Sequence, residues 1–163
     1  SEQKADYSEY AAALSEMAAK LVVDGIDKVA NGSEEGVRLV VKALISSGVA
    51  MSIAGTSRPA SGGEHKFSHW LDSHCDNPAL HGEQCGLGSI VTMYLHGGDW
   101  EKIRNTLKAV NAPINAKGLG IDKNMILSAF LNSKDIRPNR LTILDTTSSD
   151  KIKDAALATG VIS

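Results

Sequence analysis

Residues 58–84 read RPASGGEHKFSHWLDSHCDNPALHGEQ and predict two helices joined by a short break. Ser61 and Glu64 have the S-x-x-E spacing of a capping box, so the first helix is expected to start at Gly62. The Asp-Asn-Pro sequence that follows favours a turn, because proline cannot continue a helix. His81 then opens a second helix. Two helices with so short a connection are expected to pack against each other.

Four of the five histidines lie in this stretch: His65, His69, His74 and His81. His65 and His69 are four residues apart, which places them on one helix face. Packing of the two helices can bring His81 to the same place. A divalent metal such as zinc needs neutral imidazoles fixed in direction, and a rigid helix fixes them. The pattern therefore favours a metal or catalytic site over unrelated surface or core histidines.

The rest of the chain also predicts helices. Its 163 residues suffice for a core, and a hydrophobic fraction of 42% with 4% aromatics indicates packing through Ala, Leu, Val and Ile. Capping residues and apolar spacing predict helices over about residues 6–31, 33–54, 100–110, 122–131 and from 149 onward. Only residues 141–144 hint at a strand. We predict an all-α fold, a multi-helix bundle of about six to eight helices in one domain over residues 1–163.

Composition excludes several classes of protein. A net charge of −2 argues against nucleic-acid binding. Two cysteines without a C-x-x-C motif, and no apolar leader at the start, indicate a reduced cytoplasmic protein. Residues 37–55 are apolar, but Arg38 and Lys42 interrupt them, so we expect a buried helix and no membrane insertion. The two Gly-x-Gly pairs, at Gly86 and Gly118, do not follow strands and are expected to be packing or loop glycines.

Two segments carry a resemblance, TSRPASGGEHKFSHWLD and LHGEQCGLGSIVTMYLHGGDWEKIR. They resemble the C-terminal half of archaeal sn-glycerol-1-phosphate dehydrogenases, relatives of dehydroquinate synthases, glycerol dehydrogenases and iron-containing alcohol dehydrogenases. The resemblance implies the C-terminal helical domain of a dehydroquinate synthase-like enzyme, without the N-terminal dinucleotide-binding α/β domain. It also implies that His65 and His81 bind zinc and that His69 binds substrate and is catalytic. In the related dehydroquinate synthases an Arg at the position of Arg58 holds a phosphonate, so Arg58 is a candidate substrate-binding residue.

The implied reaction is the NAD(P)-dependent reduction of dihydroxyacetone phosphate to sn-glycerol 1-phosphate for membrane phospholipid synthesis, with zinc polarising the carbonyl. In the family, NAD or NADP is bound mainly by an N-terminal nucleotide-binding domain, and an Asp ahead of this region completes the zinc site. Such a domain or chain would be the partner of this one, and the complete enzyme is expected to be a homo-oligomer. The 163-residue chain alone is predicted to be inactive.

Two other functions remain open. The chain could be a zinc-stabilised helical binding module, with a closed site of His65, His81, Cys75 and Cys85. It could also be a non-catalytic remnant domain, which an unmatched apolar patch would favour. On the dehydrogenase interpretation, Cys85 is expected to be a small buried apolar residue, and Glu83 an orienting or capping group.

Overall fold

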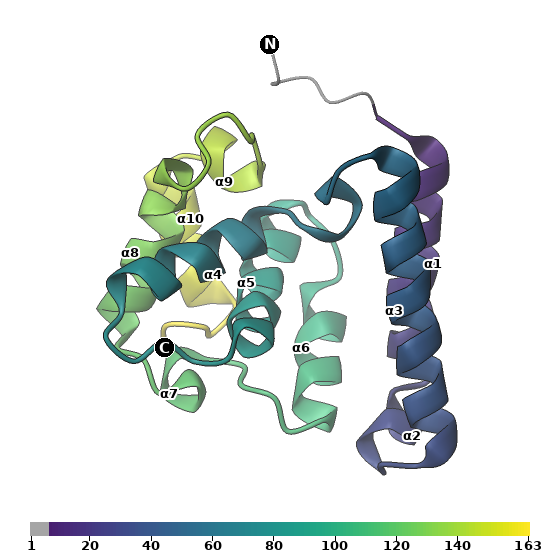
Figure 1. Cartoon of the computed structure of the whole chain (residues 1–163). Coiled ribbons are helices and arrows are strands. Elements are labelled where there is room, and N and C mark those ends of the chain that lie inside the picture. Colours follow the sequence, from purple (N-terminus) through teal and green to yellow (C-terminus); the bar gives the residue numbers. More distant parts are fainter. Residues whose placement is uncertain (1–6) are drawn as a thin grey trace. The chain divides into compact units, whose positions relative to one another are not determined.

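The computed structural model describes residues 7–163, which contain ten α-helices, two 3-10 helices and no strand (Figure 1). The all-α prediction is confirmed for these residues. Seven α-helices have ten residues or more, whereas α2 (Ile26–Ala30), α7 (Ala116–Leu119) and α9 (Ile143–Thr146) are short. The strand suggested at residues 141–144 is wrong. A reciprocal capping box between Thr142 and Asp145 starts α9 there instead.

The described residues form two compact units, residues 7–61 and residues 62–163, which we call the N-terminal unit and the histidine unit. This division does not test whether the units belong to one domain, so the single domain over residues 1–163 stays a prediction. The N-terminal unit contains α1 (Glu9–Asp24), α2, α3 (Glu34–Ala54) and the 3-10 helix η1 (Arg58–Ala60).

Small residues form the contact of α1 and α3 with their neighbouring helices in the N-terminal unit, which we call the seam. The buried positions of α1 are Ala11 and Ala18, and those of α3 are Gly36, Ala43 and Ala50. Both sets repeat every seven residues, which keeps one narrow face of each helix toward its neighbour. Ser33 caps α3 and Gly55 ends it in the left-handed conformation, as the sequence predicts. The predicted start of α1 at Asp6 lies outside the described residues, and the observed N-cap is Ser8.

The large apolar side chains of α3 lie outside this seam. Leu44 is 66% exposed and Ile45 62% exposed, so the prediction that this helix is buried is wrong. The physical reason is that the small residues of α3, rather than the bulky ones, face the neighbouring helices; Gly36, for example, lies against the Lys28 backbone of α2. Among the described residues, α3 is the one helix long and apolar enough to cross a bilayer by length and composition. Core helices pass the same test, so the absence of membrane insertion stays a prediction.

The histidine unit is built around α4 (Gly63–His74) and α5 (His81–Leu95) (Figure 1). They are followed by α6 (Trp100–Ala109), α7, α8 (Lys123–Asn132), η2 (Ser133–Asp135), α9 and α10 (Ser149–Ala158). The predicted N-caps Asp99 and Asp122 accept hydrogen bonds from the first turns of α6 and α8. These helix starts are confirmed.

The core of the histidine unit lies on one face of α4. Phe67 and Leu71 are fully buried, and the Phe67 ring stacks on Phe130 of α8 with centroids 4.1 Å apart. His65 and His69 lie on the opposite face, because positions four apart recur on one side of a helix. Because one face of α4 is buried in the core, the opposite face, which carries the histidines, points away from the core.

A buried ion pair joins α4 to α9. Lys66 Nζ lies 2.6 Å from Asp145 Oδ1, and their side chains are 2% and 7% exposed. Lys66 also donates to the Arg140 carbonyl, and Asp145 Oδ2 accepts from the backbone and hydroxyl of Thr142. Burial raises the pKa of Asp145, but the hydrogen bonds from Lys66 and Thr142 outweigh it and hold that pKa below its usual value. The residue next to His65 is therefore anchored in the unit's interior.

Candidate metal centre

Two glycines allow α4 and α5 to approach closely. A Cβ built on Gly88 of α5 would lie 3.0 Å from Glu64 Cα, and one on Gly63 of α4 would lie 3.2 Å from Thr92 Cγ2. Side chains at either position would push the helices apart. Gly86, which the sequence predicts to be a packing or loop glycine, also lies within α5. The close crossing brings the start of α5 beside the first two turns of α4.

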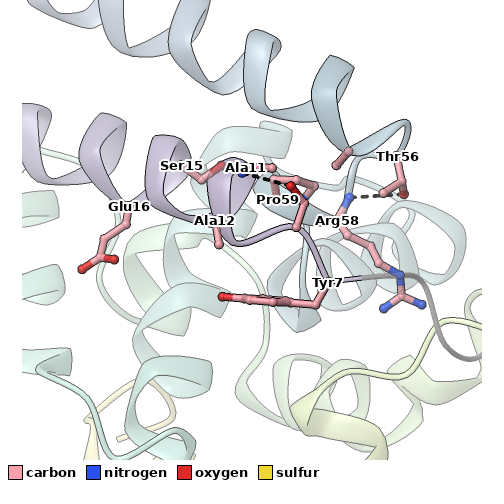
Figure 2. A pocket seen from close by; sticks show the side chains of 10 residues that line it. Tyr7, Ala11, Ala12, Ser15, Glu16, Thr56, Arg58 and Pro59 are labelled. Carbon is pink, nitrogen blue, oxygen red and sulfur yellow. Dashed lines mark hydrogen bonds between the residues drawn. The ribbon is translucent and has the colours of Figure 1, made fainter.

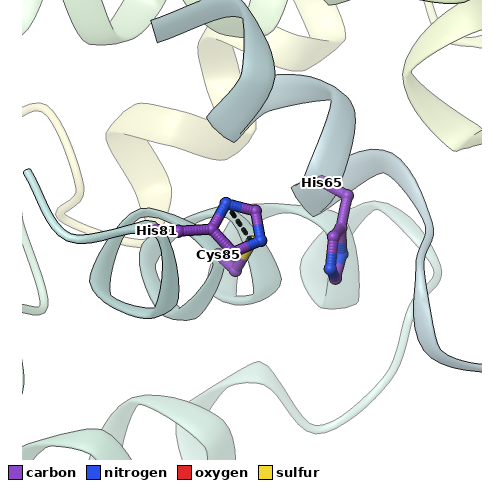
Figure 3. A group of neighbouring side chains, drawn as sticks. All are labelled: His65, His81 and Cys85. Carbon is purple, nitrogen blue, oxygen red and sulfur yellow. Dashed lines mark hydrogen bonds between the residues drawn. The ribbon is translucent and has the colours of Figure 1, made fainter. Parts of the chain in front are cut away.

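Three imidazoles converge at this crossing. The ring centroid of His81 lies 5.1 Å from that of His65 and 5.4 Å from that of His69, and His65 and His69 are 6.4 Å apart. Figure 3 shows His65 on α4 facing His81 and Cys85 on α5. His74 is separate: it is exposed, stacks on Trp70 and bonds the Trp70 carbonyl at the end of α4.

The Nδ1 atoms of two of these rings are held by oxygen atoms. His65 Nδ1 lies 2.8 Å from Glu64 Oε1, and His81 Nδ1 lies 2.8 Å from Ser68 Oγ. Metal-binding histidines commonly bond one ring nitrogen to an oxygen and offer the other to the metal. In both rings, Nε2 is the nitrogen that this arrangement leaves for a ligand.

The start of α4 differs from the predicted capping box. The N-cap of α4 is Gly62 instead of Ser61, and Glu64 Oε1 accepts from the Gly62 N–H at 2.6 Å. The carboxylate that contacts His65 is that of the adjacent Glu64. Burial raises the pKa of Glu64, yet the hydrogen bonds from His65 and Gly62 outweigh it and lower that pKa. An ionised Glu64 can orient the His65 ring.

Two sets of possible metal donors share His81. One consists of His65, His81 and Cys85, and the other of His69, Asp72 and His81, with the ligand atoms of each set within 4.8 Å of one another. Cys85 Sγ lies 3.5 Å from His81 Nε2. A nitrogen and a sulfur bound to one tetrahedral zinc lie about 3.5 Å apart. The first set thus fits zinc by donor type and by spacing. Among the described residues, Cys75 belongs to neither set.

Two neighbouring side chains shift the pKa of His65. The hydrogen bonds with Cys85 and Glu64 raise the pKa of His65 to about 9, although burial opposes them. Both partners favour the imidazolium. A metal that binds Nε2 of His65 therefore competes with a proton for that nitrogen.

His69 has the opposite shift. Burial, followed by the positive charge of Arg137 and by His81, lowers the pKa of His69, whereas Asp72 opposes the change. Its Nδ1 lies 3.6 Å from Asp72 Oδ2. His69 is therefore neutral at neutral pH and can both donate and accept a hydrogen bond.

Arg58 lies in the other unit, in η1. It lines a cavity of about 520 Å³ in the N-terminal unit together with Tyr7, Ser8 and Ser15 (Figure 2). The Arg58 N–H donates to Thr56 Oγ1 at 3.4 Å. None of the ion pairs among residues 7–163 involves the Arg58 guanidinium.

Comparison with known proteins finds similarity to one group of dehydrogenases. It is 57% identical over 162 residues to the glycerol-1-phosphate dehydrogenase (NAD(P)+) of Methanococcoides burtonii, covering 99% of this chain and 45% of that protein. Over 158 residues, 96% of the chain, identity is 56% with the same enzyme of Methanobrevibacter smithii and 58% with that of Thermococcus kodakarensis; each match covers 45% of the relative. This chain is a homologue of glycerol-1-phosphate dehydrogenases.

The homology is partial, since the chain spans about 45% of the length of the curated relatives it matches. No family model matches the chain. The resemblance carried by the SRPASG and HGEQ segments is confirmed at the level of the glycerol-1-phosphate dehydrogenases. The roles of His65, His69, His81 and Arg58 stay predictions.

Two residues of the site, Ser68 and Gln84, carry no sequence prediction, whereas Glu64 is predicted only to cap the helix and Cys85 only to be a small buried residue or a ligand of the alternative zinc module. One signal could have found Cys85, because it follows His81 by four residues and therefore shares its helix face. The alternative zinc module did include Cys85, together with Cys75, which the structure leaves out of the cluster. Ser68 and Gln84 carry no signal of their own, because their contacts depend on the register between α4 and α5.

Proposed function

We propose that the chain is the metal- and substrate-binding part of an NAD(P)-dependent glycerol-1-phosphate dehydrogenase that reduces dihydroxyacetone phosphate to sn-glycerol 1-phosphate. The observation that carries the proposal is the convergence of His65, His69 and His81 in a homologue of these enzymes. Oxygen atoms hold Nδ1 of His65 and of His81, which leaves the two Nε2 atoms for a metal, and the lowered pKa of His69 keeps that ring neutral.

His65 and His81 would hold zinc through Nε2, with Glu64 and Ser68 fixing the two rings. Bound zinc would supply Lewis-acid polarisation of the substrate carbonyl. Cys85 is the third donor that this chain offers. In a complete enzyme, the resemblance implies that a carboxylate from outside residues 1–163 takes that place.

His69 would bind and orient the substrate. Its ring lies 5.4 Å from the His81 ring, so a substrate oxygen near the metal donors is within its reach. Because its pKa is lowered, His69 is neutral at neutral pH and can donate an N–H to the reacting oxygen. If the His69 ring took up a proton, Asp72 Oδ2, which lies 3.6 Å from Nδ1, would stabilise the resulting positive charge.

Arg58 would anchor the substrate phosphate. A guanidinium binds phosphate through paired, charge-assisted hydrogen bonds. Arg58 lines a cavity of the N-terminal unit that also carries the hydroxyls of Ser8 and Ser15. The Ser15 hydroxyl is buried and has no hydrogen-bond partner within the described structure, so it is available to a ligand.

The nicotinamide cofactor would be bound mainly by a dinucleotide-binding domain or chain outside residues 1–163. The described residues contain helices and no strand, whereas a dinucleotide fold needs a parallel sheet. The complete enzyme would then be an assembly of both parts, and we expect a homo-oligomer.

One observation favours a second function, a zinc-stabilised helical module. Cys85 lies beside His81 Nε2, and a thiolate donor is common in structural zinc sites. The complete four-ligand site with two cysteines is not supported, because Cys75 Sγ contacts the Asn77 carbonyl and lies outside the cluster. On this alternative the metal would stabilise the crossing of α4 and α5 without taking part in a reaction.

A chimaera separates the two functions. In one full-length relative, the segment that matches this chain is replaced by residues 1–163, and reduction of dihydroxyacetone phosphate is followed by oxidation of NADH or NADPH. We expect zinc-dependent activity, because the segment would supply the metal ligands and the substrate groups. A folded chimaera that binds zinc but oxidises no cofactor would contradict the dehydrogenase proposal and favour the structural module.

A further inference from the structure

The further inference concerns how His81 is oriented, and it rests on the proposed metal role. His81 belongs to both donor sets, so its ring could turn either nitrogen to a metal. Which nitrogen is free depends on the groups that hold the other. Nδ1 lies 2.8 Å from Ser68 Oγ, while Nε2 lies 3.5 Å from Cys85 Sγ.

Ser68 is in turn held by Gln84. Both side chains are fully buried between α4 and α5. Gln84 Nε2 lies 3.0 Å from Ser68 Oγ and 2.7 Å from Asp72 Oδ1. A carboxylate oxygen accepts hydrogen bonds, and the Gln84 NH₂ donates one of them to Asp72. Its second N–H then points to Ser68 Oγ.

This arrangement leaves the Ser68 oxygen able to accept a hydrogen bond from His81. That oxygen has two lone pairs, and Gln84 donates to one of them. The second lone pair can accept from His81 when Nδ1 carries the ring proton. In that tautomer, Nε2 keeps its lone pair for a metal. Gln84 Oε1 is buried without a hydrogen-bond partner in the described structure, so the NH₂ contacts are what hold the amide in place.

The same contacts separate the two donor sets. Gln84 occupies one oxygen of Asp72, and Ser68 occupies Nδ1 of His81. We propose that Ser68 and Gln84 are positioning residues that fix His81 in the Nδ1–H tautomer and direct the metal, through Nε2, to His65 and Cys85. His69 and Asp72 are thereby left to the substrate.

The test compares Ser68→Ala and Gln84→Met in the 163-residue chain. Zinc affinity is measured by competition with a chromophoric chelator, and we expect each substitution to weaken it by about 10–100-fold. Ser133→Ala is the matched control, because Ser133 is also fully buried in the histidine unit but bonds the Phe130 carbonyl. Melting of the zinc-free variants checks that each one folds.

A second readout reports the tautomer directly. In the zinc-loaded chain, long-range ¹H–¹⁵N spectra should show His81 with a proton on Nδ1 and zinc on Nε2. In Ser68→Ala this preference should be lost, whereas Ser133→Ala should keep it. Zinc on Nδ1 of His81, or unchanged affinity in both variants, would overturn the inference and leave the metal role intact. Failure of the unsubstituted chain to bind zinc would overturn this inference, which takes all the ligands from this chain, whereas the proposed function is tested separately by the activity of the chimaera.

Discussion

His65→Ala should abolish stoichiometric zinc binding, whereas His69→Ala should keep the metal and lose turnover. The reason is that His65 offers Nε2 to the donor set with His81 and Cys85, while His69 lies in the other set beside Asp72. Zinc is measured by elemental analysis of the chain after dialysis. Turnover is measured in a full-length relative with the equivalent substitutions, and His69→Ala should reduce it by about 10²–10⁴-fold if the residue also transfers a proton.

His74→Ala is the matched control for both variants. His74 lies on the same helix, but it is exposed, stacks on Trp70 and belongs to neither donor set. It should change neither zinc content nor turnover. Loss of zinc from His69→Ala with retention in His65→Ala would reverse the two assignments. Retention of zinc in His65→Ala and in His81→Ala would mean that the metal lies elsewhere.

Asp145→Asn should destabilise the chain by about 3–5 kcal/mol, because it leaves the Lys66 ammonium buried without a counter-charge. The measurement is chemical denaturation at neutral pH, followed by circular dichroism. The matched control is Asp154→Asn, an exposed aspartate on α10, which should change the free energy of unfolding by less than about 0.5 kcal/mol. Lys66→Met combined with Asp145→Asn should recover much of the loss, since no unpaired charge is then buried.

The same pair predicts a pH dependence. The pKa of Asp145 is lower in the folded chain than its ordinary value of 3.8. Its contribution to stability is therefore fully present above pH 3.8 and is lost as the pH falls through the folded pKa. The difference in unfolding free energy between the unsubstituted chain and Asp145→Asn should shrink in this acid range. A difference that stays constant down to pH 2 would contradict the role of the ionised Asp145.

Much of the helical fold can be predicted from local signals. Ser33, Asp99 and Asp122 cap the helices that the sequence places after them, and Gly55 ends α3. These signals act within one turn of helix, so they survive any tertiary arrangement. The wrong prediction of a strand at residues 141–144 also came from a local signal. Three apolar residues suggested a strand, but the capping box of Thr142 with Asp145 and the pairing of Asp145 with Lys66 favour a helix.

The candidate site was only partly predictable for a different reason. The spacing of His65 and His69 places them on one face from local geometry alone. The contacts of Glu64, Ser68 and Gln84 depend on the approach of α4 to α5, which Gly63 and Gly88 allow. The exposure of Leu44 and Ile45 on α3 is also a tertiary property. Their hydrophobicity predicts burial, but the seam with α1 is made by small residues.

X-ray absorption at the zinc edge of the zinc-loaded chain tests the metal centre most directly. We predict one zinc per chain, with two imidazole nitrogens at about 2.0–2.1 Å and one sulfur at about 2.3 Å. The imidazole scattering should diminish in His81→Ala, and the sulfur should disappear in Cys85→Ser but stay in Cys75→Ser, because only Cys85 lies in a donor set. A chain that retains no stoichiometric zinc, or zinc surrounded by oxygen atoms alone, would contradict the assignment of His65, His81 and Cys85 as the metal donors of this chain.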